Sequence, residues 1–305
     1  MMFNILPAVL VALLGTVAAV GDAAADKVTD LSSLPGWPKE VPFEMYSGYI
    51  NVPDTTKNIH YVLLEAMKNP ETAPMIVWFN GGPGCSSMLG FLQETGPYVL
   101  LDGDTTYTKN NYTWNNETNI LYIEQPAGVG YSTCDNVSAP QDCVHTDNSS
   151  AHDNLQVLLG FFEKFSAKPY KTNPIYIAGE SYAGIYVPLL SYFVNEYNTN
   201  QTSNADQINL KGFMVGNGVT NWTYDTTNAT FDVTYYRMLI SQTLKDEIDA
   251  KQCNFSGIGM GDASYLTEDC YEPLNKMYDA FDGIDIYNIY GKCWDWKANT
   301  TDFTA

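Results

Sequence analysis

The segment that most constrains the fold is a short apolar run that passes through a tight turn directly into a helix. Residues 175–178 form the run, residues 179–183 (Gly-Glu-Ser-Tyr-Ala) form the turn, and residues 182–197 have helical character. Gly179 and Ala183 are small, as they must be where backbone packs closely against backbone. A strand that feeds a helix in this way is typical of a mostly parallel sheet.

The chain up to residue 216 repeats this alternation of strand and helix. Runs expected as strands are residues 44–52, 59–67, 75–79, 120–123 and 208–215, and residues 150–165 are expected as a further helix. The first two runs are separated by turn-forming residues and predict an antiparallel hairpin. We therefore expect an α/β fold, with antiparallel strands first and then a mostly parallel sheet covered on both faces.

Composition changes after residue 216. Residues 217–305 are irregular, rich in Cys and Asn, and favour helices over strands. The expected organisation is a signal peptide in residues 1–25, a sheet-bearing core in residues 26–216, and a cap or insertion in residues 217–305. A length of 305 residues suits one large domain with a substantial hydrophobic core.

The amino terminus predicts export. An apolar run spans residues 5–20, and residues 23–25 are three alanines that fit an A-x-A cleavage site. The first residues contain no Lys or Arg, which is unusual for a signal peptide. The alternative, a membrane anchor, needs about 20 apolar residues, and the run is shorter. We expect no membrane anchor after cleavage.

Glycosylation sequons agree with export and with the low charged fraction of 16%. Each has the form N-x-S/T without proline, and a glycan on each would supply surface polarity. They begin at Asn111, Asn116, Asn136, Asn148, Asn200, Asn221, Asn228, Asn254 and Asn299.

Six cysteines in an exported chain favour disulfides, although an even number leaves several pairings open. Proximity favours Cys134–Cys143 and Cys253–Cys270, which would leave Cys85 to pair with Cys293. Zinc is the alternative, but the chain has no C-x-x-C pair and its histidines lie outside ligand spacing. We expect no metal and no cofactor.

The charge balance limits the partners. A formal charge of −20 argues against nucleic acid and anionic membranes, which repel acidic proteins. The sequence does not indicate an oligomeric state.

The turn at Ser181 has the form of a nucleophile elbow, which lifts a hydroxyl clear of the sheet beside a helix amino terminus. A second glycine-rich turn, residues 80–84, follows an earlier strand at the same edge and exposes N–H groups that could stabilise an oxyanion. An ordinary serine in a β–α turn and a plain glycine turn are the alternatives. The two motifs together favour acyl transfer.

Four segments resemble the serine carboxypeptidases. They are residues 78–87 (WFNGGPGCSS), 94–97 (ETGP), 122–132 (YIEQPAGVGYS) and 179–184 (GESYAG), and residues 216–218 and 286–290 are similar to further landmarks of that family. The resemblance covers residues 35–295. It implies an α/β-hydrolase fold with a helical cap insertion, and release of single residues from peptide or protein C-termini.

The resemblance also implies roles for individual residues. Ser181 would be the nucleophile, and the backbone N–H groups of Gly82 and Tyr182 would form the oxyanion hole. The group that grips the substrate carboxylate would be Trp78, Asn80, Gly81, Glu94 and Glu180. In the family, the cysteines that match Cys85 and Cys293 are paired.

The two glutamates would repel a substrate carboxylate unless one of them held a proton. Burial and like charge both raise the pKa of a carboxyl group, so a neutral glutamic acid could donate a hydrogen bond. We expect activity at acidic pH.

Hydrolases of this fold order their triad as Ser, Asp, His along the chain. All three histidines, His60, His145 and His152, precede Ser181. Family members carry the triad Asp and His on their last strands, so we expect a C-terminally truncated chain whose last core strands are missing. The alternatives are a catalytically inactive secreted glycoprotein that acts as a binding module, and an acyltransferase on the same scaffold. The expected location is the secretory pathway, either secreted or in the lysosomal or vacuolar lumen.

Overall fold

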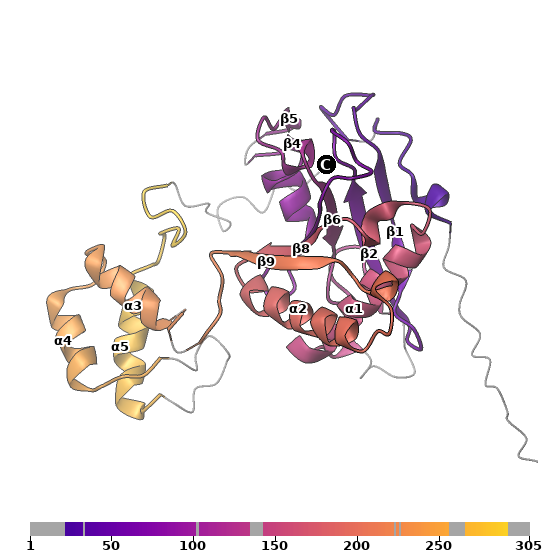
Figure 1. The fold of residues 1–305 in the computed structure, drawn as a ribbon. Coiled ribbons are helices and arrows are strands. Elements are labelled where there is room, and N and C mark those ends of the chain that lie inside the picture. The colour runs from indigo at the N-terminus through magenta and orange to yellow at the C-terminus, as the bar shows by residue number, and fades with distance from the viewer. Residues whose placement is uncertain are drawn as a thin grey trace, which may run out of the picture. The chain divides into compact units, whose positions relative to one another are not determined.

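The computed structural model describes residues 22–32, 34–101, 104–134, 143–222, 224–225, 227–255 and 266–291. It divides the chain into two compact units, with the boundary between Gly218 and Val219. The first unit carries the sheet (Figure 1). Its main strands are β1 (Met45–Asn51), β2 (Lys57–Leu64), β3 (Met75–Phe79), β6 (Asn119–Ile123), β7 (Thr133–Cys134), β8 (Ile175–Glu180) and β9 (Leu210–Gly216).

The sheet is mixed, in the order β1-β2-β6-β3-β8-β9, with β7 paired to β2. Strand β2 runs antiparallel to both of its neighbours, β1 and β6, whereas β6, β3, β8 and β9 run parallel to one another. The expected hairpin, followed by parallel strands, is confirmed. A small second sheet pairs β4 (Tyr98–Val99) with β5 (Thr108–Lys109).

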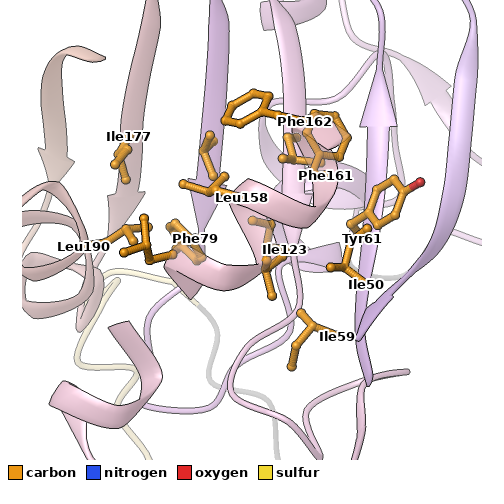
Figure 2. Packing of buried hydrophobic residues seen from close by; sticks show 14 of the residues in the cluster. Ile50, Ile59, Tyr61, Phe79, Ile123, Leu158, Phe161, Phe162, Ile177 and Leu190 are labelled. Atoms are coloured by element: carbon orange, nitrogen blue, oxygen red, sulfur yellow. The ribbon is translucent and has the colours of Figure 1, made fainter. Parts of the chain in front are cut away.

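Two long helices, α1 (Asp147–Lys164) and α2 (Ala183–Thr199), contact each other and cover one face of the sheet (Figure 1). The core between them and the strands is apolar and almost wholly excluded from solvent. Figure 2 shows how it is built, with Phe79 and Ile177 from the sheet facing Leu158 and Leu190 from the helices. Alternate strand residues point to this core because side chains in a strand alternate between faces.

The opposite face is covered differently from the first. In the hydrophobic cluster on this face, Trp78 and Tyr122 of the sheet pack with Trp37 and Phe91. Trp37 lies in the irregular segment before β1, and Phe91 lies in the short π-type helix η2 (Gly90–Glu94). Both faces are covered, as expected, but no α-helix in the described part of the chain covers this one.

The second unit contains α3 (Thr227–Tyr236), α4 (Gln242–Ala250) and α5 (Glu268–Asp279). These helices share a small core around Phe231, Phe255 and Met277. The short helical turns of the first unit, besides η2, are η1 (Ala23–Asp26), η3 (Trp114–Asn116), η5 (Pro169–Lys171) and η6 (Asn204–Asp206).

Two of the three expected disulfides are present. Cys134–Cys143 and Cys253–Cys270 have Cα atoms 5.8 and 5.7 Å apart, within the range for the bond. Cys85 is exposed and has no disulfide partner among the described residues. Because Cys293 lies outside them, its pairing with Cys85 stays a prediction.

Most sequons can be placed on the surface. The side chains of Asn111, Asn116, Asn148, Asn200, Asn221 and Asn254 are exposed. Asn136, Asn299 and the side chain of Asn228 lie outside the described residues, as do residues 1–21 of the expected signal peptide. Within the described ranges, no helix combines the length and apolarity needed to cross a bilayer.

Candidate active site

Ser181 occupies the turn between β8 and α2 in a left-handed backbone conformation, with φ of 58°. Such a value is uncommon for a residue other than glycine and is typical of strained functional turns. The turn is held by hydrogen bonds from Ser181 N to Gly216 O, 3.0 Å, and from Gly184 N to Ser181 O, 2.9 Å. The expected strand-turn-helix element is therefore present.

The glycine-rich turn after β3 touches this elbow. Strands β3 and β8 pair in parallel with Phe79 opposite Gly179, so both turns leave the same edge of the sheet. A Cβ on Gly81 would lie 2.4 Å from Tyr182 N, which leaves room only for glycine. Gly82, at φ of 111°, also needs the freedom of glycine. The two turns that carry the expected oxyanion donors are thus neighbours.

Asn80 is a buried hydrogen-bonding centre beside the elbow, with 2% of its surface exposed. Its Oδ1 accepts from Trp78 Nε1 and from Gly90 N, each 2.9 Å away. Its Nδ2 donates to Glu94 Oε1 and Glu180 Oε1, each at 3.0 Å. The expected carboxylate-binding residues Trp78, Asn80, Glu94 and Glu180 are therefore one connected network.

Burial and a neighbouring carboxyl group in this network both favour the protonated form of Glu94. Burial raises the pKa of the Glu94 carboxyl, and the neighbouring Glu180 carboxylate raises it further, while the hydrogen bond from Asn80 opposes them. A carboxyl group held neutral in this way can donate a hydrogen bond to an incoming anion.

A pocket of about 440 Å³ borders Tyr182. Its lining is Pro83, Gly84, Pro126, His145, Thr146, Asp147, Ser150, Tyr182 and Tyr186. The Tyr182 hydroxyl donates to Asp147 Oδ1 at 3.1 Å, and burial together with the Asp147 charge raises the pKa of Tyr182 to about 12. Asp147 was not predicted from the sequence, because nothing there distinguishes it from an ordinary acid at a helix start.

Each histidine has neighbours away from Ser181. His60 Nε2 lies 2.9 Å from Ser47 Oγ, and His145 Nε2 lies 3.0 Å from Ala127 O. The His152 ring packs against Phe193 with ring centroids 3.9 Å apart and the planes tilted by 37°. No hydrogen bond joins any of these three histidines, all of which the structure describes, to the Ser181 side chain.

Known proteins that are similar in sequence to this chain include the following two. Serine carboxypeptidase 24 of Arabidopsis thaliana is 38% identical over 304 residues, covering 96% of this chain and 62% of the relative. The lysosomal protective protein of Mus musculus is 33% identical over 289 residues, covering 93% and 56%. The chain thus spans a little over half the length of these relatives.

A solved structure shows the same fold. The prohormone-processing carboxypeptidase of Saccharomyces cerevisiae superposes with a TM-score of 0.67 at 23% identity, covering 85% of this chain and 58% of that one. The fold is that of an α/β-hydrolase. The family model described as serine carboxypeptidase matches residues 35–304, and the chain belongs to that family.

Proposed function

We propose that Ser181 is the nucleophile of a serine-type carboxypeptidase that removes residues from the C-termini of peptides. Its hydroxyl would attack the last peptide carbonyl, releasing the terminal residue and leaving an acyl-enzyme that water then hydrolyses. The Gly82 and Tyr182 N–H groups, on turns that touch, would stabilise the oxyanion. We assign the general-base role to none of the three histidines.

The observation that carries this proposal is the Asn80 network beside the elbow. A buried amide and two carboxyl groups beside the nucleophile are suited to holding the terminal carboxylate of a substrate. A substrate that ends in a carboxylate would accept hydrogen bonds from Asn80 and from a protonated glutamate, close to Gly81 and Trp78. Because the pKa of Glu94 is raised, binding should be strongest at acidic pH.

We propose the lumen of the secretory pathway, secreted or lysosomal or vacuolar, as the place of action. Support comes from the six exposed sequon asparagines and from the two disulfides, which persist in oxidising compartments.

Binding tests the proposal without requiring turnover. In a Ser181→Ala chain, an N-blocked dipeptide with a free carboxylate should bind at pH 5 about tenfold tighter than the same peptide ending in an amide, a difference of about 1.4 kcal/mol. Equal affinity for the two peptides would contradict a carboxylate site.

Labelling with a fluorophosphonate separates the alternatives. Modification of Ser181 in the unsubstituted chain supports a nucleophile, and its absence from folded protein favours an inactive binding glycoprotein. An acyltransferase would pass the acyl group to an added alcohol in preference to water.

A further inference from the structure

A serine, a histidine and a carboxylate form a hydrogen-bonded chain outside the elbow. Ser47 Oγ lies 2.9 Å from His60 Nε2, and His60 Nδ1 lies 2.8 Å from Glu124 Oε2. Ser47 is on β1, which is separated from β8 by three intervening strands. We propose that Ser47 is an activated hydroxyl, and that this group is a surface site that accepts acyl or phosphonyl groups from activated esters.

Strand register makes the arrangement rigid. His60 on β2 stands opposite Tyr49 on β1. On the other side, Glu124 N donates to His60 O at 3.0 Å, and His60 N donates to Ser132 Oγ at 2.8 Å. The His60 backbone is thus held between β1 and the residues that follow β6, which limits where its imidazole can lie.

The charge on Glu124 determines which ring nitrogen of His60 carries a proton. Glu124 is fully buried, and burial raises the pKa of its carboxyl, but hydrogen bonds from His60, Ser86 and Tyr131 N outweigh burial and hold it below the ordinary value. An ionised carboxylate only accepts, so Nδ1 of His60 must carry a proton. In the neutral imidazole, Nε2 is then the acceptor for the Ser47 hydroxyl, which is the tautomer that activates a nucleophile.

Solvent exposure decreases from the serine to the histidine to the carboxylate, as expected for a surface hydroxyl with a buried base and a buried acid behind it. Ser47 is exposed, His60 is 6% exposed, and Glu124 is 0% exposed. The rings of Tyr49 and Tyr131 flank the imidazole, each with its centroid 5.3 Å away, and both tyrosines are exposed. An aromatic ester could therefore approach Ser47 over apolar surface.

The reaction is a single acyl transfer. The Ser47 oxygen bonds to the ester carbonyl carbon while its proton moves to His60 Nε2. The bond to the alkoxide or phenoxide breaks, and that group leaves with the proton from His60. Ser47 lies within a strand, so no helix amino terminus assists as at Ser181. We therefore expect reaction with aryl esters and fluorophosphonates and none with peptides.

The test is mass mapping of a fluorophosphonate or p-nitrophenyl acetate adduct in the Ser181→Ala chain. Ser203, which is exposed and caps a short turn through Ala205 N, is the internal control. We expect Ser47 to be modified about 100-fold faster than Ser203, the lower end of what general-base assistance supplies.

Substitutions of the base and the acid complete the test. His60→Phe and Glu124→Gln should each bring the rate at Ser47 down to that at Ser203, while unfolding in urea confirms that the variant is folded. Equal rates at Ser47 and Ser203, or an unchanged rate in folded His60→Phe, would overturn the proposal. The comparison with Ser203 needs neither variant, so it decides the matter even if both fail to fold.

Discussion

Glu94 and Glu180, 86 positions apart in the sequence, share one hydrogen-bond donor, because Asn80 Nδ2 lies 3.0 Å from an oxygen of each. A single amide cannot compensate two negative charges in a partly buried site. The pair is therefore most stable when Glu94 carries a proton, in agreement with its raised pKa. Only in that state could the pair donate a hydrogen bond to an anion.

Glu94→Gln should change how stability depends on pH. Below the ordinary value of 4.5, Glu94 is protonated in both the folded and the unfolded chain. Above it, the unfolded chain releases this proton first, so the folded state binds more protons and the free energy of unfolding falls as pH rises towards the raised pKa. Urea unfolding between pH 4 and 8 should show this fall in the parent chain and a smaller one in the variant.

The control for that experiment is Glu163→Gln on the exposed side of α1. It removes the same charge without touching the network, so its pH profile should follow that of the parent. A Glu94→Gln profile that also follows the parent would mean that Glu94 is not the group that titrates.

Asn80→Asp should be strongly destabilising at neutral pH. The replacement keeps the oxygen that accepts from Trp78 and Gly90, but it puts a third carboxyl group in place of the donor to Glu94 and Glu180. We expect a loss of about 3 kcal/mol at pH 7, the cost of an uncompensated buried charge. Most of the loss should be recovered near pH 4, because protonation of the new aspartate and of Glu94, whose pKa is raised, would remove the repulsion. A loss that is the same at both pH values would count against charge repulsion as its cause.

Local patterns in the sequence were enough to predict the six longer strands, both long helices and the elbow, but not the two-residue strands β4, β5 and β7. The predicted boundaries were less accurate. Helix α1 was expected to begin at residue 150 but begins at Asp147, because Thr146 and Ser149 form a capping box at its start. The Ser47–His60–Glu124 chain could not be predicted, because it depends on the register of three strands. The sharing of Asn80 by two glutamates likewise depends on how three distant segments meet.

Gly81→Ala should disturb the elbow, because its Cβ would lie 2.4 Å from Tyr182 N and 2.8 Å from Ser181 Cβ. These are contacts with backbone and with a short side chain, which cannot rotate away. We expect destabilisation of about 2 kcal/mol in urea unfolding, in the range for overpacking. Gly212→Ala on β9 is the matched control, since its nearest neighbour would be 4.0 Å away. If both substitutions had the same effect, close packing of the two turns would not be the reason.

The hydrogen bond from Tyr182 to Asp147 should couple the elbow to the start of α1. Asp147→Asn, Tyr182→Phe and the double variant form a cycle whose coupling energy in urea unfolding should be about 1 kcal/mol, as for a hydrogen bond to a partly buried carboxylate. The cycle isolates this pair from the other contacts of Tyr182. Tyr197→Phe, further along α2 and hydrogen-bonded to Asp206 O, is the control and should show no coupling to Asp147→Asn. A coupling near zero for Tyr182 would mean that the phenol is held by ring packing against Tyr186 and not by Asp147.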